Sequence, residues 1–287
     1  MPPSAGYSSP TMNRPFVKMN GLGNDFVIAL TASAPSAPSA EAVRAIADRA
    51  SGVGCDQLIA LESCDDADVF MRVWNADGGA AGACGNGARC VAWLVMEASG
   101  RDSARIATDA GVLEARRAEG DLITVDMSAP GLGWRKIPLA REMDTRQLDL
   151  DVGPGLTGPG AVSMGNPHAV FFVDDAEGVD AARLGPLVEH DPLFPEGVNV
   201  GFAQIVAPDR IRLKVWERGA GLTRACGTGA CAAVVAARRR RLARRAATVE
   251  MAGGELHIDW RRADGHVMMT GPVAMEFTGR LPEGDDL

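Results

Sequence analysis

The stretch ACGNGARC at residues 83–90 places a cysteine directly before two glycines and an asparagine, at the point where an apolar helix is expected to begin. The stretch ACGTGACAA at residues 225–233 has the same arrangement, 142 positions further along the chain (226 − 84 = 142). Two such motifs indicate a duplication, and the duplication decides the fold.

The offset of 142 residues also holds upstream of the two motifs, without a gap. Chance could supply single glycines in register, but not a tryptophan, a cysteine and several polar residues together. The matched positions are Val73-Trp74 with Val215-Trp216, Gly79 with Gly221, Gly23-Asn24 with Gly165-Asn166, and Gln57 with Asn199. We therefore interpret the chain as two copies of one unit.

Each copy has the same order of expected elements. The expected strand, helix and second strand lie at 26–30, 41–50 and 68–75 in the first copy and at 169–175, 181–190 and 210–217 in the second. The cysteine motif then opens an apolar helix, about Gly87–Ala98 in the first copy and Gly229–Arg241 in the second. Further strands follow each of these helices.

An apolar helix must be buried, so strands on both sides of it predict a sheet that curls around it. We expect an α+β fold of two pseudo-symmetric domains, each a barrel-like, mostly antiparallel sheet around a central helix. Residues 14–148 and 161–272 form the two halves, and the glycine- and proline-rich stretch 149–160 links them. Residues 1–13 are expected to be a disordered lead.

Composition excludes several classes of protein. A formal net charge of −8 argues against a nucleic-acid-binding surface, and the basic run at 237–245 reads as the solvated end of a helix. No apolar stretch reaches the roughly 18 residues of a membrane span, and the N-terminus lacks the apolar core of a secretory signal. We therefore expect a cytoplasmic protein with reduced thiols.

Cys84 and Cys226 are the candidate reactive groups. Each stands at a helix start, where free backbone N–H groups and the helix dipole favour a thiolate and are expected to lower its pKa. The same N–H groups suit a carboxylate. Two thiols on opposite sides of one carboxylate predict proton removal from one face of its α-carbon and delivery to the other, which is racemisation or epimerisation by two bases.

Other roles for the cysteines are less well supported. The remaining four, Cys55, Cys64, Cys90 and Cys231, are expected to serve packing. Neither a CxxC pair nor clustered histidines predicts a metal site, and no GxGxxG follows a strand. We expect no metal and no cofactor.

Six motifs carry a resemblance to a known family: KMNGLGNDFVI, GCDQLI, WNADGGAAGACGNGARC, MGNPHAVFF, GVNVGF and WERGAGLTRACGTGACAA. Together, from about Pro15 to Phe277, they resemble the diaminopimelate epimerases. The resemblance implies cofactor-independent conversion of LL-2,6-diaminopimelate to the meso form, in lysine and peptidoglycan precursor synthesis. It also implies that the last strand, about 273–283, returns to the first domain. We further expect a homodimer.

The resemblance assigns roles to individual residues. Cys226 is implied as the base that takes the α-proton of the LL isomer, and Cys84 as the acid on the other face. His168 and Glu217 are implied to support the two cysteines. The implied substrate contacts are Asn24, Gln57, Asn75, Gly85, Asn86, Asn166, Asn199, Glu217, Arg218, Gly227 and Thr228. An arginine fork suits the distal carboxylate of the substrate.

Three positions depart from the family pattern: Asn20, Ala80 and Leu222. They border the motifs and bear on loop packing more than on chemistry.

Two other cysteine-pair enzymes, proline racemase and hydroxyproline epimerase, are the nearest alternatives, but their substrates lack a second amino-acid head. The phenazine-type isomerase lacks the cysteine pair. A non-catalytic amino-acid-binding protein is the alternative from a different class, and retention of both cysteines counts against it.

Overall fold

The computed structural model describes residues 14–30, 38–81, 84–153 and 156–281, so the expected lead at 1–13 lies outside the described residues. The first half contains β1 (Pro15–Gly21), β2 (Asn24–Leu30), α1 (Ala40–Ala47), β3 (Gln57–Glu62), β4 (Val69–Asn75), β5 (Ala80–Ala81), α2 (Gly85–Ser99), β6 (Ser103–Thr108), β7 (Gly111–Arg117), the 3-10 turn η1 (Glu119–Asp121) and β8 (Ile123–Asp126). The second half and the final strand contain β9 (Gly160–Ser163), β10 (Pro167–Phe172), α3 (Ala181–Glu189), β11 (Asn199–Ala207), β12 (Arg210–Glu217), β13 (Gly221–Thr223), α4 (Gly227–Arg239), β14 (Ala246–Met251), β15 (Gly254–Trp260), β16 (Val267–Gly271) and β17 (Ala274–Arg280).

The duplication is visible in the strand registers. In the first half β2 pairs in parallel with β3, and Phe26 lies opposite Gln57. In the second half β10 pairs in parallel with β11, and His168 lies opposite Asn199. The same offset relates the two pairs (26 + 142 = 168 and 57 + 142 = 199), so the repeat in the sequence is also a repeat in space.

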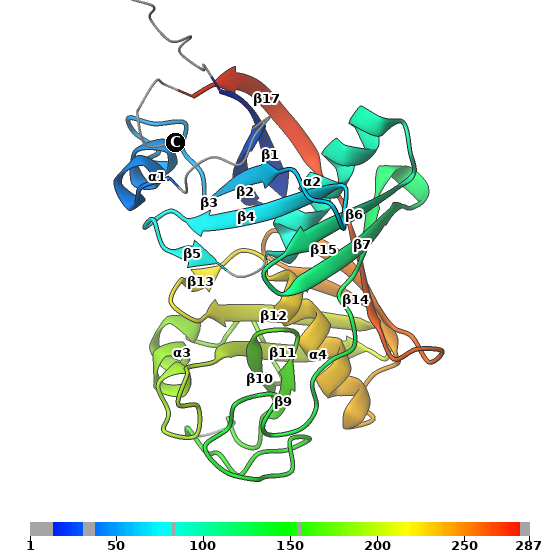
Figure 1. The fold of residues 1–287 in the computed structure, drawn as a ribbon. Helices are drawn as coiled ribbons and strands as arrows, with labels where there is room; N and C mark the ends of the chain where they lie inside the picture. Colours follow the sequence, from blue (N-terminus) through cyan, green and yellow to red (C-terminus); the bar gives the residue numbers. More distant parts are fainter. Residues whose placement is uncertain (1–13, 31–37, 82–83, 154–155, 282–287) are drawn as a thin grey trace, which may run out of the picture.

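The two half-sheets are joined along β8 and β16, which pair antiparallel. Most other pairings are antiparallel; the parallel ones are β2–β3, β4–β6, β10–β11 and β12–β14. The final strand β17 pairs antiparallel with β1, and Figure 1 shows it running back along the first half. Two repeated units of sheet around a helix confirm the predicted α+β class.

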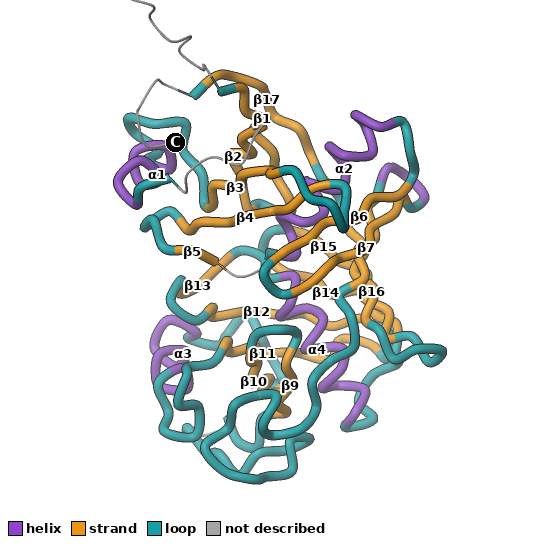
Figure 2. Tube along the Cα trace, in the orientation of Figure 1, coloured by secondary structure: helices purple, strands orange, loops and turns teal. Residues whose placement is uncertain are grey.

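The central helices α2 and α4 are buried along most of their length. Residues of both helices belong to one hydrophobic core, and the two helices contact each other. Figure 2 shows α2 and α4 among strands of the two halves, whereas α1 and α3 lie on the left of the view, one in each half. Among the described residues, no helix is long and apolar enough to cross a membrane.

Both central helices begin two residues earlier than predicted, at Gly85 and Gly227. The sequence suggested that the glycines delay the helix start. The structure gives the reason for the difference: the preceding cysteine is the N-cap residue, and its side chain accepts a backbone N–H from the first turn. A satisfied first-turn N–H stabilises a start that glycine alone would disfavour.

Residues 137–148, which the sequence assigned to the first half, pack with the second half. Ile137, Leu139 and Leu148 are buried in the hydrophobic core that contains residues of β10, β11 and α3. Gly131 also forms a β-bridge with Ser163 in β9. The apolar side chains of this segment are buried against the second half, so the change of packing partner precedes the predicted linker at 149–160.

The basic run at 237–245 is more than a solvated helix end. The helix α4 ends at Arg239, and Arg241 has a left-handed backbone conformation with a φ of 62°. Arg239 donates hydrogen bonds to the carbonyl oxygens of Thr145 and Ala161, at 3.2 and 3.1 Å. The end of α4 therefore holds segments of chain that precede and follow the predicted linker.

Candidate active site

Cys84 and Cys226 occupy the N-cap positions of α2 and α4. Cys84 Sγ accepts the backbone N–H of Gly87 at 3.2 Å, and Cys226 Sγ accepts that of Gly229 at 3.4 Å. Sulfur thus takes the place that a hydroxyl, carboxylate or amide oxygen takes in most helices. Glycine is suited to both positions, because a Cβ there would lie only 3.3 Å from the sulfur.

The N-termini of α2 and α4 approach each other where the two halves meet. A Cβ on Gly227 would lie 3.2 Å from Asn86 Oδ1 and 2.8 Å from Met269 Sδ. A Cβ on Gly85 would lie 3.1 Å from Met269 Cε. The two glycines therefore permit the close approach, and it brings the free first-turn N–H groups of both helices to one junction.

The prediction that the helix N-termini lower the pKa of both cysteines is wrong. Burial raises the pKa of Cys84 to about 11, although the Gly87 amide and the Arg89 charge act in the opposite direction. Burial also raises the pKa of Cys226 well above its usual value, and the Glu217 charge adds to the rise. The loss of hydration destabilises each thiolate by more than the helix dipole and the backbone N–H groups stabilise it.

A chain of hydrogen bonds leads to Cys226 from the second half. Thr228 Oγ1 lies 3.6 Å from Cys226 Sγ, and Asn166 Nδ2 donates to Thr228 Oγ1 at 3.3 Å. Asn166 Oδ1 is in turn 3.0 Å from Nε2 of the buried His168. Burial, with a contribution from the Arg218 charge, lowers the pKa of His168 to about 3. The imidazole is therefore neutral, and Nε2–H donation to Asn166 would orient the amide toward Thr228.

Glu217 and Arg218 lie at the end of β12. Thr223 Oγ1 donates to Glu217 Oε1 at 2.6 Å, and burial raises the pKa of this carboxyl. Asn199 Oδ1 accepts the backbone N–H of Arg218 at 3.0 Å. The exposed Arg218 side chain donates from Nη1 to the Glu196 carbonyl oxygen at 2.8 Å, which orients the guanidinium.

Three predicted polar residues of the first half lie on the neighbouring strands β2, β3 and β4. Asn24 Oδ1 is 4.0 Å from Cys84 Sγ. Gln57 Nε2 donates to Asn75 Oδ1 at 2.9 Å, which agrees with the position of these residues opposite each other in the β3–β4 pair. The structure thus places Asn24 beside Cys84, and it links Asn166, His168 and Thr228 to Cys226 through hydrogen bonds.

Sequence reasoning did not single out Asp56. Its Oδ2 accepts from Asn24 Nδ2 at 2.8 Å and from the backbone N–H of Asp25 at 3.0 Å, and its Oδ1 pairs with Arg49 at 2.7 Å. Asp56 therefore holds Asn24 in place beside Cys84. Its position directly before Gln57, inside the GCDQLI motif, was the available signal.

The three departures from the family pattern lie in strands: Asn20 near the end of β1, Ala80 in the short β5 and Leu222 in the short β13. Asn20 Oδ1 accepts the backbone N–H of Gly23 at 2.8 Å, in the turn between β1 and β2. Ala80 is opposite Trp74 in the β4–β5 pair, and Leu222 is opposite Trp216 in the β12–β13 pair. These residues shape the edges of the two halves.

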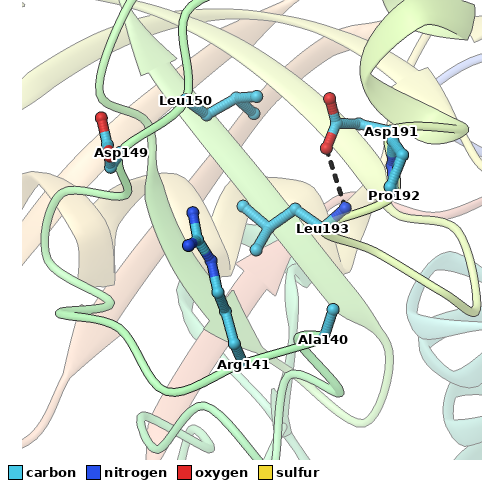
Figure 3. A pocket seen from close by; sticks show the side chains of 7 residues that line it. All are labelled: Ala140, Arg141, Asp149, Leu150, Asp191, Pro192 and Leu193. Atoms are coloured by element: carbon cyan, nitrogen blue, oxygen red, sulfur yellow. Dashed lines mark hydrogen bonds between the residues drawn. The ribbon is translucent and has the colours of Figure 1, made fainter.

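A separate pocket of about 370 Å³ lies on the loops of the second half. Figure 3 shows its lining residues, Ala140, Arg141, Asp149, Leu150, Asp191, Pro192 and Leu193, with Asp191 Oδ1 accepting the Leu193 N–H at 2.8 Å. None of the predicted site residues lines this pocket.

Known proteins match the chain over nearly its whole length. The family model for diaminopimelate epimerase matches residues 16–132 and 160–276, which are the two repeated units. The chain belongs to the diaminopimelate epimerase family. Relatives of that name include one from Phenylobacterium zucineum, 62% identical over 277 residues (96% of this chain and 100% of the relative), and one from Caulobacter vibrioides, 57% identical over 284 residues (95% and 99%). Membership of the diaminopimelate epimerase family makes the chain an isomerase.

Solved structures share the fold at low sequence identity. A hydroxyproline epimerase from Agrobacterium vitis matches with a TM-score of 0.66 and 15% identity, covering 95% of this chain and 93% of that one. A phenazine biosynthesis protein of the PhzF family from Enterococcus faecalis matches with a TM-score of 0.65 and 13% identity, covering 94% and 100%. At such low sequence identity, these matches show that the solved structures share the fold of this chain, and they say nothing about its substrate.

Proposed function

We propose that this protein converts LL-2,6-diaminopimelate to meso-diaminopimelate by proton transfer between two cysteines, without a cofactor. The observation that carries the proposal is the matched placement of Cys84 and Cys226 as N-caps of two buried helices whose N-termini meet. Membership of the diaminopimelate epimerase family supports the choice of substrate.

In the proposed reaction, the reacting carboxylate lies at the joined helix N-termini. The amides of Gly85, Asn86, Gly227 and Thr228 bind it and stabilise the negative charge that develops when the α-proton leaves. Cys226, as the thiolate, takes the α-proton of the LL isomer. Cys84 then delivers its own S–H proton to the opposite face and is left as the thiolate.

The raised pKa values of the thiols suit this chemistry. A thiolate whose conjugate acid has a high pKa is a strong base, and an α-proton beside a carboxylate is only weakly acidic. The cost is a small thiolate fraction at neutral pH. His168 and Glu217 would support the cysteines, His168 through Asn166 and Glu217 through its charge.

The remaining predicted residues would bind the two amino-acid heads of the substrate. Arg218 suits the distal carboxylate, since a guanidinium offers a planar fork of donors. Amide side chains suit both ammonium and carboxylate groups. In this proposal they are Asn24, Gln57, Asn75, Asn166 and Asn199. Glu217 would contribute an acceptor for an ammonium group.

The biological setting belongs to the same proposal. The reaction would serve lysine and peptidoglycan precursor synthesis in the cytoplasm, and the protein would act as a homodimer. Light scattering of the purified protein measures the oligomeric state, and fractionation of cells measures the compartment.

Incubation of the purified protein with LL-diaminopimelate in deuterated water tests the function. We expect meso product with deuterium at one α-carbon, and no exchange with proline or trans-4-hydroxyproline. Activity on the cyclic amino acids instead would favour the racemase alternative. Binding of diaminopimelate without α-deuterium exchange would favour the non-catalytic alternative.

A further inference from the structure

Arg89, in the second turn of α2, is a fully buried cation. Its side chain has 0% exposure. Nη1 lies 3.5 Å from Met269 Sδ in β16, and Nε and Nη2 have no hydrogen-bond partner among the described residues. Arginine keeps its charge under all ordinary conditions, so this site holds a positive charge with unusually few polar contacts.

The backbone closes around this guanidinium. A Cβ on Gly21 in β1 would lie 3.4 Å from Arg89 Nη2, and a Cβ on Gly271 in β16 would lie 3.3 Å from Nε. Both positions are glycine, so the chain leaves room for the arginine where the two half-sheets meet. Long side chains in a helix lean toward its N-terminus, which here is the end that carries Cys84.

No carboxylate compensates this charge among the described residues. The side chains that act on the pKa of Arg89 are Cys90, Cys84 and Cys231, and burial lowers that pKa overall. A cation near the N-terminus of a helix adds to the positive end of the dipole instead of offsetting it. A buried charge without a partner is costly, and the missing partner must be an anion.

The equivalent position in the second half carries no charge. It is Cys231 (89 + 142 = 231), which is fully buried in α4. Conversely, Glu217 occupies the position of the uncharged Asn75 (75 + 142 = 217). The two halves are therefore asymmetric in charge: the first carries a buried cation on the helix that Cys84 caps, and the second carries a carboxylate beside Cys226.

We propose that Arg89 is a positioning residue that supplies the counter-charge for the thiolate left on Cys84 when Cys84 gives its proton to the α-carbon. This inference rests on the proposed two-cysteine reaction. When Cys84 gives its S–H proton to the α-carbon, one C–H bond forms, the S–H bond breaks, and the negative charge remains on sulfur within the field of Arg89. The same field favours Cys84 as the base in the reverse direction.

Two charged groups, Arg89 and Glu217, act on these thiols, and a test must separate the effect of one from that of the other. The Arg89 charge lowers the pKa of Cys84, and the Glu217 charge from β12 raises it. Glu217 also raises the pKa of Cys226, for which no effect of Arg89 is found. A change at Arg89 should therefore act on Cys84 far more than on Cys226.

The test compares Arg89→Met, Arg89→Lys and the unchanged enzyme. The pH dependence of alkylation of each cysteine, followed by peptide mapping, gives the apparent pKa of each thiol, since access to the site alters the plateau and not the midpoint. We expect Arg89→Met to raise the midpoint of the pH dependence of Cys84 alkylation by about one pH unit or more, with little change at Cys226. In Arg89→Lys, which keeps a positive charge, we expect the Cys84 midpoint to stay close to that of the unchanged enzyme. Each unit corresponds to about a tenfold loss of thiolate at a given pH below the midpoint.

Kinetics and thermal unfolding complete the test. We expect kcat/KM to fall by the same factor in both directions for Arg89→Met, because a variant cannot change the equilibrium constant. Replacing an unpaired buried charge with an apolar side chain of similar length should leave the Tm unchanged or raise it. Arg239→Met is the matched control on α4: its guanidinium is hydrogen-bonded to carbonyl oxygens, so we expect a lower Tm with unchanged thiol midpoints.

An unchanged Cys84 midpoint in folded Arg89→Met would overturn the inference, as would a lower Tm with normal kcat/KM, the pattern of a structural role. The alkylation readout needs no diaminopimelate. Failure of the unchanged enzyme to turn over diaminopimelate would therefore count against the proposed function and leave the charge relationship between Arg89 and Cys84 open to measurement.

Discussion

Asn86 Nδ2 lies 3.5 Å from the carbonyl oxygen of Ala225, the residue that precedes Cys226. The first turn of α2 therefore reaches the chain segment that caps α4. Because Cys84 and Cys226 are the caps of these two helices, their relative position is set by packed helix ends and not by a free loop. A site that depends on two opposed groups benefits from such rigid support.

Loss of either sulfur is expected to abolish epimerisation. Cys84→Ala and Cys226→Ala should each lower kcat by about 10²–10⁴-fold, because general acid–base catalysis by one partner is lost. Each variant should still fold, with a stability loss of about 1 kcal/mol from the missing helix cap. The control is Cys64→Ala, at a partly exposed cysteine outside the site. Near-normal turnover by Cys84→Ala would rule out the two-base mechanism.

Replacement of Arg218 by lysine is expected to weaken substrate binding. A point charge cannot reproduce a bidentate fork, and the loss should be about 1.5–3 kcal/mol, the value of a hydrogen bond to a charged group. Calorimetric titration with diaminopimelate measures it, using an inactive cysteine variant to prevent turnover. Arg141→Lys, on the separate pocket of the second half, is the control. Equal affinity in both variants would remove Arg218 from the site.

The rate is expected to rise with pH through the neutral range. The pKa of Cys84 is raised to about 11 and that of Cys226 is raised as well, so the thiolate fraction of the free enzyme increases with pH below those values. Glu217→Gln removes a charge that raises both, so the rising limb of kcat/KM should move to lower pH.

The control for this shift is Glu250→Gln, which changes a carboxylate in β14 that pairs with Arg212 of β12 at 3.1 Å. It should leave the pH profile in place. If Glu217→Gln instead moves the rising limb to higher pH, Glu217 acts as a proton acceptor for Cys226 and not as an opposing charge.

His168 is expected to make the fold sensitive to acid. Its folded-state pKa is lowered to about 3, whereas the unfolded chain binds the proton near the usual value of 6.5. The unfolded state therefore binds more protons between these values. The stabilisation that His168 contributes is present above pH 6.5 and decreases as the pH falls toward 3. Between pH 6.5 and pH 4.5 the loss should be about 2–3 kcal/mol.

Urea unfolding of His168→Phe, the residue type found at the equivalent position 26, measures this contribution. The variant should lose less stability than the unchanged protein between pH 7 and pH 4.5. His257→Gln, at an exposed histidine in β15, should behave like the unchanged protein. An identical acid response in His168→Phe would contradict the buried, neutral imidazole.

Local and repeated features of the chain were predictable from the sequence. The offset of 142 residues, the apolar helices and the cysteine motifs are patterns of neighbouring residues, and the structure reproduces them as two similar units with matched strand registers. Asn24 beside Cys84, and the chain from Thr228 through Asn166 to His168 at Cys226, were indicated by the family motifs. The starts of the two central helices were missed by two residues, because the sulfur cap requires knowledge of where each cysteine Sγ points.

Charge and burial were decided only by the tertiary structure. From sequence, a helix start predicts a lowered cysteine pKa, but the strands packed around Cys84 and Cys226 remove water and raise it. Arg89 reads as one polar residue in a helix, yet β1 and β16, far apart in the chain, enclose it completely. Desolvation is a property of all the segments that surround a group, and no local pattern of residues contains it.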